Sequence, residues 1–74
     1  MILKDAKVGS QYLVESLKLD RVTMSRLEAL GLTKGTTIKI LNRNRSGSVI
    51  IMVRGSRFAL GNKITEAIQI REAS

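Results

Sequence analysis

The stretch Met24-Ser-Arg-Leu-Glu-Ala-Leu-Gly-Leu-Thr-Lys-Gly-Thr-Thr-Ile-Lys-Ile-Leu41 contains a helix end, a tight turn and the start of a strand. A helix that ends just before Gly31 favours a left-handed residue there, and glycine adopts that conformation without a steric penalty from a Cβ atom. Leu32 then occupies the position where a Schellman motif places an apolar residue. Gly35 supplies a second positive φ in the following turn. We therefore predict that both glycines are structural turn residues.

A short helix, ending at about Leu30, is predicted before this turn. Asp20 is a suitable N-cap, because its carboxylate can accept hydrogen bonds from the free N–H groups of the first turn. Met24, Leu27 and Leu30 recur every three residues, and we expect them to form the buried stripe of the helix. Leu32 is expected to pack back on Leu27.

The rest of the chain is divided by glycines, since it contains no proline. The short intervals between the glycines favour several short strands over long helices. We predict strands over residues 11–19, 36–42, 48–54, 57–60 and 67–71. The dipeptide Gly55-Ser56 is expected to form a two-residue type II′ hairpin loop, with Gly55 as a further structural turn residue.

The segment over residues 61–66 is too short for a full helix and is predicted to form one 3-10 turn. Together these elements predict a mainly β fold, a small SH3-like antiparallel barrel of five strands. It has one short α-helix after the first strand and the 3-10 turn before the last strand. With 74 residues, the chain is expected to be a single domain spanning residues 1–74.

The predicted strand over residues 48–54 is unusual, because Val49-Ile-Ile-Met-Val53 is apolar on both faces. Each side of such a strand must be covered, or one side must be a partner site. We expect the helix to cover one side.

The composition excludes several classes of function. The chain has no cysteine and no histidine, so it lacks thiolate and imidazole ligands and the side chain best suited to proton transfer near neutral pH. No Gly-x-x-x-x-Gly-Lys-Ser/Thr phosphate loop occurs. We therefore expect no enzymatic activity. The sequence also has no apolar run of the length that crosses a membrane and no signal peptide, so we expect a soluble, cytoplasmic protein.

The net charge of +7 is concentrated in one part of the chain. No acidic residue occurs between Glu28 and Glu66. The cations in this window are Lys34, Lys39, Arg43, Arg45, Arg54, Arg57 and Lys63. A region of one sign attracts anionic partners, but the same charge also gives a solvated face, and the sequence leaves both interpretations open.

The order and spacing of the glycines and apolar residues at the helix end and in the predicted strands resemble the FeoA family, the small cytoplasmic proteins of bacterial ferrous iron uptake. The resemblance covers about Val8 to Arg71. Its motifs are Arg26-Leu27-x-x-Leu30-Gly31-Leu32-x-x-Gly35-Thr36-x-Ile38-x-Ile40, Val53-Arg54-Gly55-Ser56-Arg57-Phe58-Ala59-Leu60 and Glu66-Ala67-Ile68-Gln69-Ile70. The chain departs from the family at Ser48, where a proline is common. We expect the loop over residues 43–48 to be looser as a result.

The resemblance implies an SH3-like fold, a role in ferrous iron transport and partnership with FeoB. FeoB is a membrane transporter with a cytoplasmic GTP-hydrolysing domain, and binding it places this chain at the inner face of the membrane. The family domain is also described as binding transition metals, so the resemblance allows a weak contact with ferrous iron or another divalent metal.

The residues themselves predict no tight iron site. Ferrous iron prefers imidazole and carboxylate ligands, and here the carboxylates are scattered singly. A weak carboxylate contact at Asp20 or Glu15 stays open, although helix capping by Asp20 and solvent exposure of Glu15 explain these residues better. We therefore expect no cofactor.

We expect the exposed face of the helix and the adjacent loops to form the FeoB-facing surface. The candidate partner-binding residues are Arg21, Arg26, Leu32, Lys34, Arg43, Arg45, Arg54 and Arg57. For Leu32, a contact at the helix end is the better explanation. A less favoured hypothesis has Arg43 or Arg45 acting as an arginine finger on the partner's GTPase site.

Two alternatives remain. Small basic SH3-like barrels also bind nucleic acid, although this chain has only two aromatic residues and no known binding motif. Weak attachment to anionic lipid head groups is the other alternative. Salt separates the hypotheses, because phosphate binding weakens steeply with ionic strength while a contact centred on apolar residues is less affected.

Overall fold

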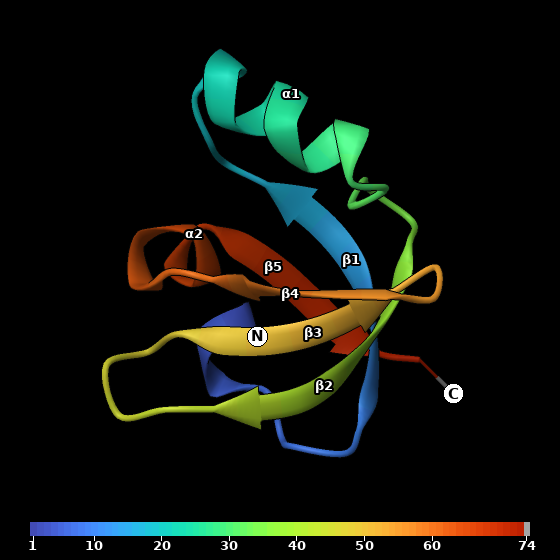
Figure 1. The fold of residues 1–74 in the computed structure, drawn as a ribbon, viewed down its shortest axis with the longest axis vertical. Helices are drawn as coiled ribbons and strands as arrows, with labels where there is room; N and C mark the ends of the chain where they lie inside the picture. Colours follow the sequence, from blue (N-terminus) through green and yellow to red (C-terminus); the bar gives the residue numbers. More distant parts are fainter. Residues whose placement is uncertain (74) are drawn as a thin grey trace.

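The computed structural model describes residues 1–73 and shows a small antiparallel β barrel with one helix standing at its end (Figure 1). Five strands form one sheet with the order β4-β3-β2-β1-β5. The elements are a 3-10 turn (Leu3–Asp5), β1 (Gln11–Leu17), α1 (Arg21–Ala29), β2 (Thr37–Arg43), β3 (Val49–Val53), β4 (Ser56–Leu60), α2 (Asn62–Glu66) and β5 (Ile68–Glu72). The predicted fold class, a mainly β barrel of SH3 type with a helix after the first strand, is confirmed.

The sheet curves because β1 and β2 are irregular. The pairing of β1 with β5 shifts in register between Val14 and Ser16, and the pairing of β2 with β3 shifts between Ile40 and Asn42. An extra residue of this kind bends a strand and increases its twist. The bends let five short strands enclose a single core (Figure 1).

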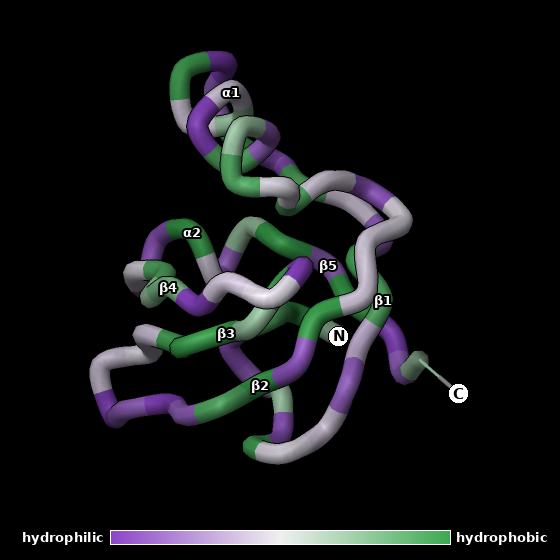
Figure 2. Tube along the Cα trace, turned by 45° about the vertical axis from the view of Figure 1, so that its right-hand side comes forward, coloured by the Kyte–Doolittle hydropathy of each residue, from purple (hydrophilic) through white to green (hydrophobic). Residues whose placement is uncertain are grey.

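The core is built from alternate residues of the strands. In β3, Val49, Ile51 and Val53 are buried, and in β2 the buried residues are Ile38 and Ile40. Figure 2 shows that hydrophobic residues gather in the strands, whereas the tube of α1 alternates between hydrophobic and hydrophilic residues. Successive side chains of a strand point to opposite faces, so each strand gives only half of its residues to the core.

The C-terminal end of α1 has the predicted geometry. Gly31 has a φ of +90°. The Leu32 N–H donates to the Leu27 carbonyl at 2.9 Å, and the Gly31 N–H donates to the Glu28 carbonyl at 3.0 Å. These two bonds define a Schellman motif. In the next turn the Thr36 N–H donates to the Thr33 carbonyl, and Gly35 has a φ of +89°.

The predicted buried stripe of α1 was largely wrong. Of the three residues expected there, Leu27 is buried, Met24 is half-buried and the side chain of Leu30 is 49% exposed. The reason is the position of the helix, which stands at one end of the barrel and does not lie across the sheet (Figure 1). Leu27 and Leu32 reach the core from this end of the molecule, and Leu17 and Leu19 pack at its margin.

Two turns differ from the prediction. Val53 pairs with Ser56, so the β3–β4 loop consists of Arg54 and Gly55, one residue earlier than expected. Both residues have positive φ, +51° and +82°, which makes the turn type I′ and not type II′. Gly55 keeps its predicted role as a structural turn residue.

The helical turn before the last strand is α-helical and not 3-10. Within α2 the Thr65 N–H donates to the Gly61 carbonyl four residues earlier, at 3.0 Å. The Thr65 hydroxyl holds this turn in place, because it donates to the Gly47 carbonyl at 2.8 Å from a fully buried position. A 3-10 turn does occur, at Leu3–Asp5, and it was not predicted.

The N-terminal segment closes one edge of the sheet. The Ile70 N–H in β5 donates to the Met1 carbonyl at 2.7 Å, and the N-terminal amine donates back to the Ile70 carbonyl at 3.1 Å. Ile2 forms a bridge with Gln69. The outer edge of β5 is therefore hydrogen-bonded to the N-terminal segment.

The β2–β3 loop is ordered by Asn44. The Asn44 side chain accepts hydrogen bonds from the N–H groups of Ser46 (3.1 Å) and Ser48 (3.2 Å). A proline at position 48 has no N–H and could not make the second bond. The loop that we expected to be looser is thus held by hydrogen bonds to Asn44.

Replacing Gly31 with alanine is expected to lower the free energy of unfolding by about 1 kcal/mol, because the left-handed conformation penalises a Cβ atom. The new Cβ would also lie 3.0 Å from Cδ of Arg54. Gly35→Ala is the matched control, since Gly35 has the same φ and open space around it. Chemical denaturation of both variants measures the costs. A Gly31→Ala protein as stable as the wild type would contradict the assigned helix end.

Candidate partner-binding surface

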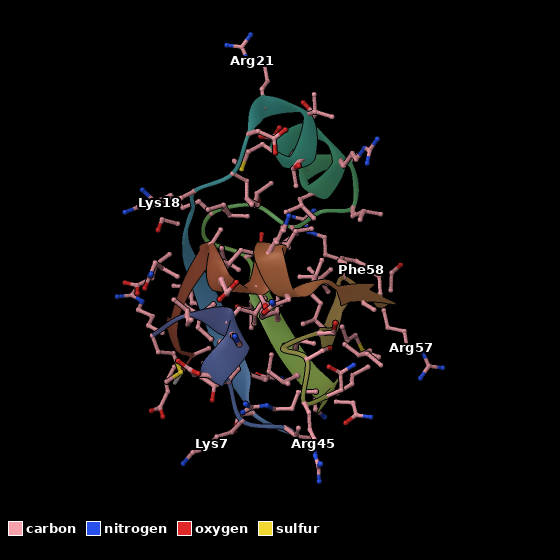
Figure 3. All side chains as sticks on the ribbon, turned by 90° about the vertical axis from the view of Figure 1, so that its left-hand side faces the viewer. Lys7, Lys18, Arg21, Arg45, Arg57 and Phe58 are labelled. Carbon is pink, nitrogen blue, oxygen red and sulfur yellow. The ribbon has the colours of Figure 1, made fainter. Side chains whose placement is uncertain are left out.

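The predicted partner-binding residues do not form one patch. Seven of the eight are exposed: Arg21, Arg26, Lys34, Arg43, Arg45, Arg54 and Arg57. Figure 3 shows Arg21 at the outer end of α1 and Arg45 at the opposite end of the molecule, in the β2–β3 loop. The predicted residues are thus divided between opposite ends of the molecule.

Leu32, the eighth residue, is fully buried. It belongs to the Schellman motif at the end of α1 and cannot face a partner in this structure. Its assignment to the partner surface is corrected to a core and helix-cap role.

Arg54 joins the β3–β4 hairpin to the end of α1. Its side chain crosses Gly31, whose missing Cβ leaves the room that the Arg54 side chain occupies. A cation at the C-terminal end of a helix interacts favourably with the helix dipole. Arg54 also has a left-handed backbone, which costs roughly 1–2 kcal/mol in a residue other than glycine. Arg54 is therefore exposed but not free, since its conformation serves the turn.

Arg43 is also partly engaged. Its Nη1 atom donates to the Ala6 carbonyl at 3.0 Å, which ties the end of β2 to the N-terminal segment. This contact gives Arg43 a structural role, which the sequence did not indicate. Arg45 lies in the β2–β3 loop with an exposed side chain.

The uncovered surface lies on the sheet. We call it the outer face, and its members are Lys39, Asn42, Ile50, Met52, Arg57 and Ala59, which are all exposed. The register places Met52 between Lys39 and Arg57, and Ile50 between Asn42 and Ala59. Ile50 is 36% exposed and Met52 is 37% exposed. The outer face is therefore a small apolar strip with a cation on each side of Met52.

The expectation that the helix covers the second side of β3 is wrong. Because α1 stands at the end of the barrel, it leaves Ile50 and Met52 in contact with solvent. The apolar pattern on both faces of β3 was the signal that could have located this surface from the sequence. What the sequence could not show was which side remained open.

The protein surface has two shallow hollows, and one of them adjoins the outer face. One of about 230 Å³ continues the outer face and is lined by Asn42, Arg43, Asn44, Ser48, Ile50 and Ala59. The other, of about 420 Å³, is lined by Leu13, Val14, Glu15, Lys34, Gly35 and Arg71. Lys34 is therefore on a different side of the barrel from the outer face, since it lies with β1 and β5 residues.

The exposed side of α1 offers a second apolar area. Val22 is 62% exposed and Leu30 is 49% exposed, at opposite ends of the helix. Arg26 lies between them in sequence, and in the described part of the chain it has no ion-pair partner. Within residues 1–73 the one ion pair joins Lys4 Nζ to Glu66 Oε2 at 3.4 Å.

The carboxylates of the described chain do not gather. Among residues 1–73, no group of three or more acidic side chains is placed to hold a metal ion. Asp20 acts as the N-cap of α1, accepting hydrogen bonds from the hydroxyl and the N–H of Thr23. These two bonds lower the pKa of Asp20, and the hydroxyl makes the larger contribution.

Within residues 1–73, α1 and α2 are both too short to span a bilayer.

The sequence of the chain matches a known family and a curated relative. The sequence model of the FeoA domain family matches residues 1–72. A protein of Methanocaldococcus jannaschii described as a putative Fe(2+) transport protein A is 32% identical over 68 residues, which cover 92% of this chain and 82% of that protein.

Solved structures agree with this match. The crystal structure of an iron uptake regulatory protein (FeoA) superposes with a TM-score of 0.88 at 29% identity, covering 99% of this chain and 97% of that one. The solution structure of a FeoA protein from Chlorobium tepidum gives a TM-score of 0.90 at 24% identity, covering 100% of this chain and 71% of that one, and supports the fold alone.

The Asp20 cap predicts an acid-sensitive helix. Because the folded-state pKa lies below its ordinary value of 3.8, the contribution of the ionised carboxylate to stability is complete above that value. It is lost as the pH falls through the lower folded-state pKa. The Thr23 amide shift, followed from pH 6 downwards, should report this loss. In Asp20→Asn the uncharged amide still caps the helix, so this part of the pH dependence should vanish.

The two sides of β3 should respond differently to substitution. Ile50→Thr and Met52→Thr are expected to change the free energy of unfolding by about 0.5 kcal/mol or less, because both side chains are partly exposed and threonine suits a strand. Ile51→Ala should cost about 2–5 kcal/mol, because Ile51 is fully buried. Urea denaturation compares the three. A large loss in Ile50→Thr would show that the outer face belongs to the core.

Proposed function

The chain belongs to the FeoA family of ferrous iron transport proteins, and from this membership we propose that it is an accessory protein that binds the cytoplasmic part of an FeoB transporter. In this proposal the protein acts by docking, and it regulates the transporter without catalysing a reaction. It therefore works in the cytoplasm, at the inner face of the membrane. Ferrous iron is the cargo of the transport system, and the site offered here is a protein-binding surface.

The observation that supports docking is the outer face. The core of this small domain is closed, yet Ile50 and Met52 stay exposed beside Lys39 and Arg57. Protein interfaces combine an apolar centre with a polar rim. The cations at the rim would raise the association rate with an acidic partner, while burial of the apolar strip would slow dissociation.

The spread of the cations over the barrel suits long-range attraction of an acidic partner better than one specific ion pair. Lys39 and Arg57 lie on the outer face, whereas Lys34 lines the hollow beside β1 and β5. The cations of the acid-free window therefore create a broad positive field. A field of this kind orients a partner from a distance but does not select one position. Selection then depends on the outer face and on the adjoining β3–β4 hairpin.

Binding is tested by amide chemical shifts of the labelled protein on addition of the cytoplasmic domain of its own FeoB at moderate salt. We expect saturable shifts in β2, β3, β4 and the β3–β4 turn. Met52→Asp should weaken binding at least about tenfold, because it places a charge in the apolar strip. Val22→Asp, on the exposed side of α1, is the matched control and should change binding little.

Other results distinguish the alternatives. Shifts centred on Val22 and Leu30 would move the docking surface to α1. Shifts that appear only with duplex DNA, or only with anionic vesicles, and that disappear between low and moderate salt would replace the FeoB proposal. Specific shifts of carboxylate-bearing residues on addition of ferrous iron alone would instead support a metal contact.

A further inference from the structure

The sheet has two outer edges, which differ in their hydrogen bonding. The edge at β5 is hydrogen-bonded to the N-terminal segment through Met1 and Ile70, and through the bridge of Ile2 with Gln69. Among the described residues, 1–73, nothing covers the edge at β4 in this way, because in the sheet order β4 is paired with β3 alone. Open edges of this kind are templates for pairing with another extended chain.

The hydrogen-bond pattern of the hairpin identifies the free groups of β4. A type I′ turn over Arg54 and Gly55 makes Val53 and Ser56 a hydrogen-bonded pair. In an antiparallel ladder such pairs alternate with pairs that are not hydrogen-bonded to each other. Arg57 and Ala59 therefore direct their N–H and C=O groups away from β3.

The residues that carry these groups lie at the surface of the protein. Arg57 and Ala59 are both exposed, and within residues 1–73 neither makes a backbone or side-chain hydrogen bond outside the sheet. Figure 3 shows the Arg57 side chain pointing away from the body of the protein, with Phe58 beside it on the same edge of the barrel. The open edge thus offers two donor–acceptor pairs in line, a length that an added strand can use.

The charge near this edge limits what can occupy it. Arg54 and Arg57 lie on the β3–β4 hairpin and Lys63 follows β4 in α2, while no acidic residue occurs between Glu28 and Glu66. Pairing of two copies through β4 would bring together two domains of charge +7 and both sets of these cations. An acidic segment would instead neutralise them, so charge complementarity favours a different chain.

We infer that the free edge of β4 is a strand-addition site for an extended, acidic segment of the partner. The inference rests on the proposed function and names the part of the surface where FeoB docks. Main-chain hydrogen bonds to Arg57 and Ala59 supply the register. Acidic side chains of the added strand face Arg57 on the outer face, and alternate apolar ones face the half-buried Phe58.

Hydrogen exchange tests this arrangement directly. In the free protein the amides of Arg57 and Ala59 should exchange rapidly, whereas those of Ser56, Phe58 and Leu60 should be protected by β3. On saturation with the FeoB cytoplasmic domain, exchange at Arg57 and Ala59 should slow at least about tenfold, since each amide gains a hydrogen bond. Protection confined to these two outward amides is the signature of an added strand.

Two pairs of variants separate main-chain pairing from charge. Ala59→Pro removes an N–H that the hairpin does not use, so the fold should survive while binding weakens about tenfold or more. Ala59→Val keeps that N–H and should bind normally. Arg57→Glu should weaken binding strongly. Lys18→Glu makes the same change in net charge on the opposite side of the molecule and should have little effect (Figure 3).

The outcomes are distinct. If the FeoB domain binds the wild type but leaves Arg57 and Ala59 in fast exchange, strand addition is overturned and the proposed function stands. If it does not bind at all, the proposed function and the strand-addition site both fail. If Ala59→Pro proves unfolded, the exchange pattern of the wild type still decides the question. Doubling of the molecular mass with protection of the same amides in the free protein would replace the partner segment by a second copy.

Discussion

The alternation of buried and exposed residues along β3 is the constraint on which the architecture depends. Val49, Ile51 and Val53 are buried, and β3 pairs with β2 on one side and β4 on the other. A chain of 74 residues has few core residues to spare, so a shift of one position would exchange the buried and exposed sets in the strand. The same alternation forces Ile50 and Met52 outward. The core and the outer face are therefore consequences of a single register.

The contact between Arg54 and Gly31 links the two halves of the chain. A glycine is needed at the end of α1 for its positive φ, and its missing side chain also makes room for Arg54. The type I′ turn holds Arg54 in a left-handed conformation, which is unfavourable for an arginine. The helix end and the β3–β4 hairpin thus constrain each other, although 22 residues separate Gly31 from Arg54 in the sequence.

The proposed function depends on surfaces and not on a reactive centre. The cations that looked like one patch in the sequence are divided by the barrel among several sides, and some of them have structural tasks. Arg43 bonds to the Ala6 carbonyl, and Arg54 packs on the helix end. We propose that the outer face and its neighbouring edge are the surface left for a partner. There an apolar strip, exposed cations and unpaired main-chain groups lie within one hairpin and the strand beside it.

The sequence by itself determined the features that depend on neighbouring residues. Gly31 and Gly35 fixed the helix end and the next turn, because positive φ is a local preference, and Asp20 fixed the helix start through a bond to Thr23. The alternation of Ile38 with Ile40 gave the core side of β2, and the motif spacing gave the family. Tertiary structure decided the features that depend on distant pairing. It buried Leu32, exposed Leu30 and left Ile50 uncovered, because the position of α1 relative to the sheet is set by packing and not by the helix sequence. It also closed the edge of β5 with Met1 and left that of β4 open, since an edge exists only once all strands have found their partners.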